Sequence, residues 1–302
     1  MNTAIRSLLY GFIAGEAVGR AARDDTAYPC ETGTDGRPPN DWGDHTDQLM
    51  ATLSAVHMNR NTPTPFKYDD IYKTIVAKYR CINTAVILRS NLAKHMAVTN
   101  AGVCDFASQF SGQTFSENYD ALPRAFVAGC LSRFRANGYQ IALHMCKITH
   151  NTPASLYASL FVARVASLFV FGSSPLDDYD AVFASSVGRV KSRLTGNLDG
   201  NALCVFPEIN RCVLSLRAAI ALLDPDAETY AADANKVWTD IVKEHTDGVA
   251  HAPFIGAVVG AVAAAALHIV PREIASLPDK CILGPVELFI TWHNALYQTG
   301  SA

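Results

Sequence analysis

The chain has 302 residues, of which 49% are hydrophobic and 18% are charged, and its formal net charge is -3 at pH 7. This composition excludes a disordered chain and is sufficient for one large domain or two modest ones. The small negative charge excludes a strongly basic surface, so we expect neither a nucleic-acid nor a membrane partner.

The first expected helix covers residues 3–22 and has two distinct faces. Apolar residues recur at helical spacing from Ile5 to Ile13, while glycines at positions 11, 15 and 19 repeat on another face, where a neighbouring backbone can come close. Glu16 continues the apolar stripe. A carboxylate that faces the core needs a cation, a metal or strong hydrogen-bond donors, whereas a position on the solvated rim needs none, and both interpretations are open.

Residues 23–43 are rich in glycine, proline, aspartate and threonine, which predicts a long irregular loop of a kind that is often functional. Ten helical patterns follow, at about 45–60, 66–95, 121–136, 138–149, 153–172, 177–194, 203–223, 226–243, 249–268 and 285–298. Thr152 before Pro153 is typical of a helix start. Two further segments, 195–201 and 277–285, are clusters of turn residues. Strand-like alternation is almost absent and no fixed repeat occurs, so the sequence predicts one all-α, bundle-like domain.

The segment 248–271 contains no Asp, Glu, Lys or Arg, and it is long enough to cross a bilayer core of about 30 Å. It consists mostly of alanine, glycine and valine, and it lacks the large apolar residues and the aromatic or basic flanks of a membrane-spanning helix. The composition therefore favours a small-residue helix packed inside the protein.

The eight cysteines are scattered, with no CxxC pair and no secretory segment before them. Most of them lie in apolar runs, which favours free, buried thiols in a reducing compartment over a disulfide framework or a zinc knuckle. We therefore expect a cytoplasmic or nuclear protein that is not secreted.

Two His-Thr-Asp tripeptides, at residues 45–47 and 245–247, stand out as candidate chemistry. They contain hard oxygen donors close to expected helix starts, and such donors suit Mg²⁺, Mn²⁺ or Ca²⁺. Their histidines could add nitrogen ligands, which favour softer divalent ions. The oxygen donors concerned are Asp44, Thr46, Asp47, Thr246 and Asp247.

Helix capping is the alternative interpretation of both tripeptides. Asp44, with Asp47 three residues later, resembles a capping box, and Thr246 or Asp247 could cap the helix expected at 249–268. A helix N-terminus needs an acceptor whether or not a metal is bound, so the spacing alone fits either role.

Five segments resemble, in order and approximate spacing, motifs of the ADP-ribosylglycohydrolase family. They are "GFIAGEAVGRAA", "DWGDHTDQLMATLSAV", "NYDALPRAFVAG", "ITHNTPASLYASL" and "HTDGVAHAPFIGAVVGAVAAAALHIVP". The resemblance implies that residues 1–302 form a single compact, orthogonal multi-helix bundle. It also implies an enzyme in which Mg²⁺ ions bind ribose hydroxyls and help to break the glycosidic bond of ADP-ribose, with ADP-ribose or an ADP-ribosylated protein as the partner.

The first motif in the family is similar to Gly-Asp-Ala-Leu-Gly with a glutamate seven residues after the Asp. Here Gly15 and Gly19 match and are implied substrate-binding residues, while Glu16 takes the place of the Asp as an implied catalytic residue. The position of the family's glutamate falls on an arginine. The acids that could replace it are Asp24, which we take as a candidate catalytic residue, Asp25 and Glu31.

The second and last motifs depart from the family pattern at metal ligands. In Trp-Thr-Asp-Asp-Thr, Asp44 and Thr46 fit, but His45 replaces one aspartate. In Asp-x-Asp-Thr, Asp247 keeps the first position, while a valine and an alanine take the other two ligand positions. The resemblance therefore implies one Mg²⁺ or Mn²⁺ ion or none, with Asp44 also a candidate catalytic residue. The candidate metal ligands are Asp44, His45, Thr46 and Asp247.

The middle motifs imply two further substrate-binding residues, Asp120 and His150. Their neighbours match helix-packing positions as well as chemistry, and a histidine at a helix end is often a structural cap. The expected function is weak ADP-ribosyl hydrolysis. The alternatives are an inactive relative that binds ADP-ribose or another partner, and an all-α scaffold in which the two tripeptides are only caps.

Overall fold

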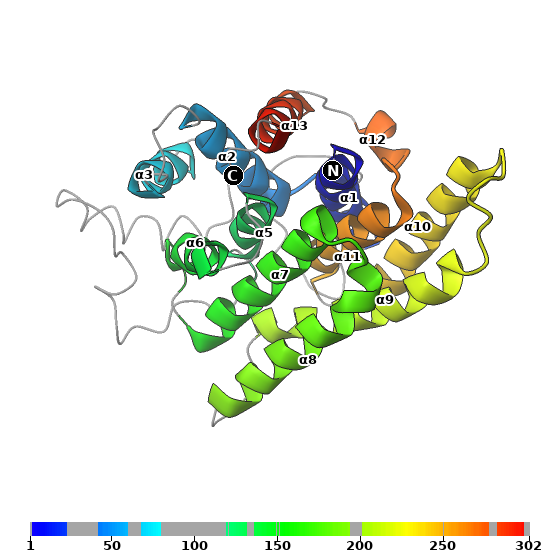
Figure 1. The fold of residues 1–302 in the computed structure, drawn as a ribbon, viewed down its shortest axis with the longest axis horizontal. Helices are drawn as coiled ribbons and strands as arrows, with labels where there is room; N and C mark the ends of the chain where they lie inside the picture. The colour runs from blue at the N-terminus through cyan, green and yellow to red at the C-terminus, as the bar shows by residue number, and fades with distance from the viewer. Residues whose placement is uncertain are drawn as a thin grey trace.

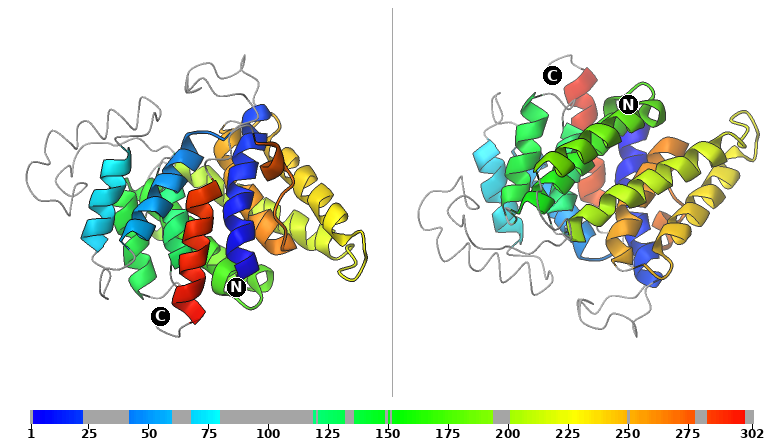
Figure 2. Two further views of the ribbon diagram at one scale, coloured as in Figure 1. Left: turned by 90° about the horizontal axis from the view of Figure 1, so that it is seen from above. Right: turned by 90° about the horizontal axis from the view of Figure 1, so that it is seen from below.

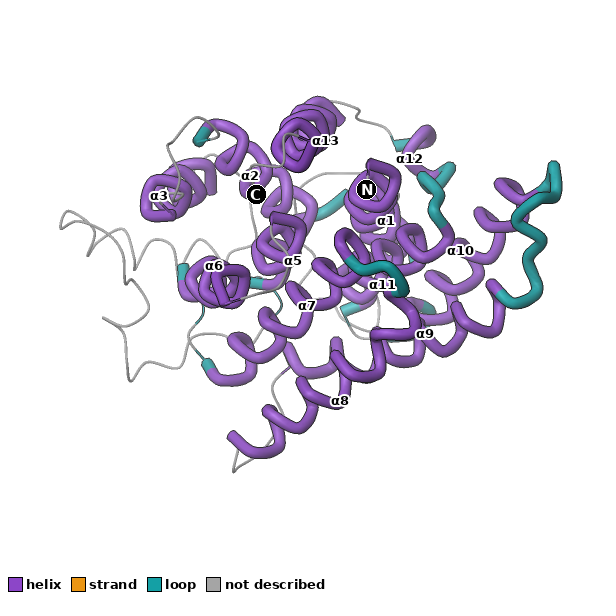
Figure 3. The backbone as a smooth tube through the Cα atoms, viewed as in Figure 1, coloured by secondary structure: helices purple, strands orange, loops and turns teal. Residues whose placement is uncertain are grey.

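The computed structural model describes residues 2–22, 42–59, 68–79, 119, 121–131, 136–148, 150, 152–193, 201–249, 251–277 and 283–298. Throughout these ranges the chain forms helices joined by turns, and they contain no strand (Figures 1 and 3). The all-α prediction is therefore confirmed. The long loop predicted at 23–43 lies outside the described residues up to position 41.

The described helices follow the predicted pattern closely, while residues 80–95 of the helix predicted at 66–95 and residues 195–200 of the predicted turn cluster lie outside the described residues. The helices are α1 (Asn2–Ala21), α2 (Asp44–Met58), α3 (Tyr68–Tyr79), α5 (Leu122–Leu131), α6 (Ala136–Lys147), α7 (Pro153–Phe171), α8 (Pro175–Arg193), α9 (Val205–Ile220), α10 (Tyr230–Thr246), α11 (Ala252–Leu267), α12 (Glu273–Ser276) and α13 (Leu283–Gln298), with a 3₁₀ turn at Asn201–Cys204. Two differences stand out. The short helix α12 was not predicted, and α13 begins inside the segment predicted as turn because Gly284 and Pro285 lie in its first turn, where proline is tolerated.

The centre of the molecule is the antiparallel pair α1 and α11, which have the most extensive contact of any two described helices (Figures 1 and 2). Gly11 faces Gly260, and Gly15 faces Gly256. A Cβ atom added to Gly15 would lie 2.0 Å from the Gly256 carbonyl oxygen. The absence of side chains on both helices therefore lets the two backbones touch, as the glycine spacing predicted.

The other helices surround this pair. The indole of Trp238 on α10 donates a hydrogen bond of 2.8 Å to the Gly260 carbonyl, so α10 is fixed against the same glycine face. Helices α5, α6 and α8 pack on α7, while α2 lies between α3, α5 and α13. Helix α13 also contacts α1, and the left view of Figure 2 shows α13 beside both α1 and α2.

Helix α11 is buried along nearly its whole length, which agrees with the prediction for segment 248–271. Within the described ranges, only α7 is both long and apolar enough to cross a membrane, and 72% of its most apolar window is buried inside the protein. The described cysteines are all free. Cys130, Cys146 and Cys212 are buried, in agreement with the prediction for most of the cysteines, whereas Cys204 is exposed.

Helix α13 is attached to α5 by a buried histidine. The Nε2–H group of His293 donates to the Cys130 carbonyl oxygen at 2.8 Å, and the side chain is fully buried. Burial lowers the pKa of His293 to about 4, because the charged imidazolium would be poorly solvated there. The fold therefore holds this residue in its neutral form.

The glycine contact predicts opposite effects for two glycine-to-alanine changes. Gly15→Ala should destabilise the protein by about 1–3 kcal/mol, because the new methyl group meets backbone that cannot move aside. Gly188→Ala on α8 is the matched control, since no atom lies within 4 Å of its added Cβ, and it should stabilise the helix by about 0.5–1 kcal/mol. Urea unfolding measures both. Equal effects of the two changes would contradict the close approach of α1 and α11.

The buried histidine predicts a specific loss of stability in acid. Because the folded pKa of His293 lies below its ordinary value of 6.5, its contribution is complete above pH 6.5 and is lost as the pH falls through about 4. Between pH 7 and pH 4, the wild type should therefore lose about 3 kcal/mol more than His293→Gln. His144→Gln, at an exposed position on α6, should leave the wild-type slope unchanged. Parallel pH profiles for wild type and His293→Gln would disprove this assignment.

Candidate functional site

The Glu16 carboxylate of α1 is a buried polar group that is bonded by another helix. It is fully buried, and both of its oxygen atoms accept hydrogen bonds from the first turn of α2. Oε1 accepts the backbone N–H of His45 at 3.0 Å, and Oε2 accepts the backbone N–H of Thr46 at 2.9 Å. The structure therefore supports the first interpretation of Glu16, a carboxylate that faces the core and is bound by strong hydrogen-bond donors.

The imidazole of His45 supplies a third donor. Its Nδ1 lies 2.9 Å from Glu16 Oε1, and the histidine side chain is 18% exposed. Burial would raise the pKa of Glu16, but the hydrogen bond and positive charge of His45 outweigh it and bring the pKa to about 2. An ionised carboxylate can only accept, so Nδ1 carries the hydrogen and donates it.

This arrangement corrects the capping interpretation of the first tripeptide. The N-cap residue of α2 is Gly43, which has no side chain, and Asp44 lies inside the helix instead of preceding it. Asp47 does not complete a capping box. Its Oδ1 accepts the indole N–H of Trp42 at 3.1 Å. The N–H groups that an N-cap side chain normally binds are bound by Glu16, from another helix.

Gly43 and Arg20 complete the surroundings of the carboxylate. A Cβ atom on Gly43 would lie 2.8 Å from Glu16 Oε1 and 2.8 Å from Arg20 Nη1. The carboxylate and the guanidinium therefore both lie close to the same point, and a side chain at position 43 would require at least one of them to shift. Arg20 follows Glu16 by one helical turn, a spacing from which the sequence could have predicted their proximity.

An aromatic cluster adjoins this centre at the start of α11. The ring of His45 lies 5.3 Å from that of Phe254, and Tyr119 stacks on Phe254 at 4.4 Å. The ring of Tyr119 also meets the edge of His251 at 4.8 Å. His251 has a left-handed backbone (φ 62°), which is uncommon for a residue other than glycine and is often found at functional sites. Sequence analysis missed this cluster, because only the fold brings Tyr119 to the first turn of α11.

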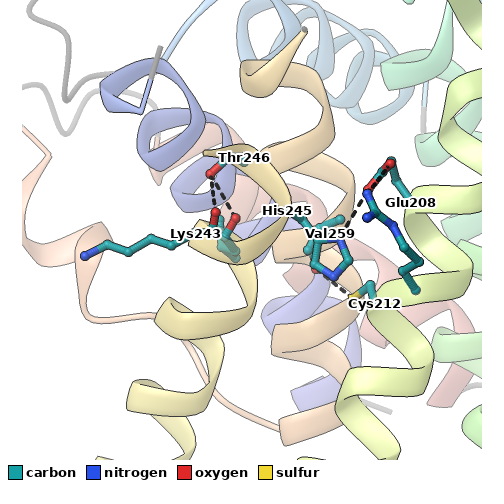
Figure 4. Close-up of polar contacts among 8 residues, drawn as sticks. Glu208, Cys212, Lys243, His245, Thr246 and Val259 are labelled. Carbon is teal, nitrogen blue, oxygen red and sulfur yellow. Dashed lines mark hydrogen bonds and ion pairs between the residues drawn. The ribbon is translucent and has the colours of Figure 1, made fainter. Parts of the chain in front are cut away.

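The second tripeptide has a different environment, at the end of α10 (Figure 4). His245 is buried, and its Nδ1 lies 3.2 Å from Glu208 Oε2 on α9. The hydroxyl of Thr246 donates to the Val242 carbonyl within α10. Asp247 is exposed and follows the last residue of α10. The prediction that Thr246 or Asp247 caps α11 is wrong, since the N-cap residue of α11 is His251.

The other predicted site residues have mixed positions. Gly15 and Gly19 lie beside Glu16 and contact the backbone of α11, so their described role is helix packing. His150 is fully buried, and its backbone N–H bonds to the Cys146 carbonyl just after α6. Asp24 and Asp120 lie outside the described residues. The catalytic and substrate-binding roles of all five remain predictions.

Three of the four predicted metal ligands lie together, and the fourth lies on another element. Asp44, His45 and Thr46 share the first turn of α2, beside Glu16, while Asp247 begins the connection between α10 and α11. Within the described ranges, no three His, Cys, Asp or Glu side chains form a group that could hold an ion. The Glu16 carboxylate fits a metal poorly, since three N–H donors and a nearby guanidinium already surround it.

Replacing Glu16 by glutamine tests its role as the cap of α2. Glu16→Gln removes the negative charge and leaves at least one buried donor without an acceptor, so it should destabilise the protein by about 1–3 kcal/mol. Asp226→Asn, at an exposed position in the turn between α9 and α10, is the control and should change stability by less than about 0.5 kcal/mol. Chemical denaturation measures both variants. Equal stability of Glu16→Gln and wild type would refute the capping role.

Comparison with known proteins agrees with this arrangement of helices. Residues 2–281 match the sequence profile of the ADP-ribosylglycohydrolase family. A solved structure described as an "ADP-ribosylglycohydrolase-related protein complex" superimposes with a TM-score of 0.59 at 16% identity, covering 97% of this chain and 98% of the other. No curated protein sequence gives a significant match. Because the family profile covers nearly the whole length, the chain belongs to the ADP-ribosylglycohydrolase family.

Proposed function

We propose that this protein binds ADP-ribose, free or attached to a protein, and cleaves its glycosidic bond only weakly. The binding site would be the end of the fold where the second half of α1 meets the first turns of α2 and α11. The observation that carries this proposal is the hydrogen bonding of Glu16. Its two oxygens accept hydrogen bonds from three N–H groups of α2, so they are not available for a proton transfer.

The groups at this end suit a ribose. Asp44 is half-buried in the first turn of α2, and its carboxylate can accept hydrogen bonds from hydroxyl groups. The ring of His45 is held by Glu16 through Nδ1 and is 18% exposed, so this imidazole lies at the edge of the proposed site. The rings of Tyr119, His251 and Phe254 lie next to these polar groups. A few polar groups beside aromatic rings are typical of small-molecule sites.

Weak cleavage follows from the charges that the site lacks. When Mg²⁺ is bound in a protein of this chemistry, it orients water and stabilises charge at the anomeric carbon. In this chain the last motif has Val249 and Ala250 where two oxygen ligands are implied, and neither side chain can ligate a metal. Losing one such electrostatic element commonly costs about 10²- to 10³-fold in rate. The remaining residues would bind and orient the sugar without a fully assembled catalytic centre.

A protein that only binds ADP-ribose, without any cleavage, is the second candidate. It is favoured by the same observation, since a capping carboxylate contributes to stability but not to chemistry. The two candidates differ in one measurable property, the slow release of ADP-ribose from a modified substrate.

Calorimetry and a release assay together test the proposal. ADP-ribose should give saturable heat with the wild type, and His45→Ala should weaken binding about 10-fold or more, because a bonding group next to the sugar is lost. Asp226→Asn should bind as the wild type does. Release from an ADP-ribosylated peptide should be slow with or without Mg²⁺. The absence of heat with folded protein would exclude the binding function, and rapid Mg²⁺-dependent release would exclude weak cleavage.

A further inference from the structure

The first turn of α2 has its own source of positive charge. Its backbone N–H groups carry the positive end of the helix dipole, and two of them bond directly to Glu16. The ring N–H of His45 adds a third bond. A carboxylate offers about four acceptor positions, so three are filled by the protein itself.

The Arg20 guanidinium adds a permanent positive charge close to the same carboxylate. Its Nη1 and the Glu16 Oε1 lie 2.8 Å from the same point, the place where a Cβ of residue 43 would be. An arginine stays protonated at every ordinary pH. A divalent cation that approached Glu16 would therefore have to displace bonded N–H groups and overcome repulsion from Arg20.

Gly43 leaves room for this arrangement. A larger residue would place its Cβ 2.8 Å from both the carboxylate and the guanidinium, so one of these two side chains would have to shift. Glu16 and Arg20 therefore occupy space that a side chain at residue 43 would need. Three residues that differ from the implied motifs therefore pack together and depend on one another: Glu16, Gly43 and His45.

We propose that Arg20, the His45 ring and the N-terminus of α2 together replace a divalent cation at Glu16, so that this part of the site is held without metal. Glu16 is a positioning residue for α2 in this arrangement and not a metal ligand. The proposal concerns how the site is held, so it does not depend on whether the protein binds ADP-ribose.

Metal titration of the wild-type protein tests the proposal directly. After dialysis against a chelator, the melting temperature should be the same with chelator, Mg²⁺ or Mn²⁺, since a ligand stabilises only the state that binds it. Mn²⁺ also broadens NMR signals of nearby nuclei. In histidine-labelled protein, the ring signals of His45 should broaden no more than those of the exposed His268. Selective broadening of His45, together with Mn²⁺-dependent stabilisation, would overturn the proposal. Neither readout involves ADP-ribose, so failure of the proposed function would leave this result unaffected.

A double-mutant cycle tests, without any metal, whether the packing of Gly43 and Glu16 is coupled. Gly43→Ala should lower the melting temperature by several degrees, whereas the same change at Gly188 should not, since its added Cβ meets no atom. Glu16→Asp withdraws the carboxylate by one methylene from the space beside residue 43. Gly43→Ala should therefore cost less in the Glu16→Asp background than in the wild type. Additive effects of the two changes would show that Gly43 does not serve Glu16 and would overturn the coupling.

Discussion

The direct contact between the backbones of α1 and α11 is the constraint on which the rest of the structure depends. At Gly15 and Gly256 no side chain separates the two helices, so their relative position is fixed to the accuracy of backbone contact. Two functional consequences follow. Glu16, the next residue of α1, is aimed at the N-terminus of α2, and the first turn of α11 brings Phe254 against the ring of His45. The candidate site is therefore determined by glycines that have no chemistry of their own.

A buried carboxylate in the middle of this contact would be expensive without compensation. The compensation here comes from the least specific groups in the protein, backbone N–H donors, which every helix N-terminus provides. They bind Glu16 in place of water, while the hydrogen bond and positive charge of the His45 ring lower the pKa of Glu16 against the effect of burial. The charge thus joins α2 to α1. Because the same three hydrogen bonds occupy the carboxylate oxygens, Glu16 has little remaining capacity to bind a substrate or an ion.

Much of the fold was predictable because helical periodicity is a local property. The bounds of α1, α7 and α11, the close approach at Gly15 and the burial of α11 all followed from the spacing of residues within one helix. The site was less predictable, because its contacts join different helices. Capping of α2 by Glu16 spans 29 residues, and the stacking of Tyr119 on Phe254 spans far more of the chain. The spacing of residues could suggest that the N-terminus of α2 needs a hydrogen-bond acceptor. Only tertiary packing determines that this acceptor is Glu16 of α1, because the N-cap residue Gly43 has no side chain.

The two His-Thr-Asp tripeptides show why the same residues can have different roles. His45 and Thr46 lie in the first turn of a helix, where backbone N–H groups have no partner in the helix and point outward to Glu16. His245 and Thr246 lie in the last turn of α10, where backbone N–H groups are bonded to carbonyls of the preceding turn and do not point outward. The Thr246 hydroxyl donates to the Val242 carbonyl one turn earlier, and the His245 side chain contacts a carboxylate on α9. A tripeptide whose backbone N–H groups bind an anion at a helix start therefore cannot bind one through its backbone at a helix end, and the apparent symmetry of the two motifs does not describe two halves of one site.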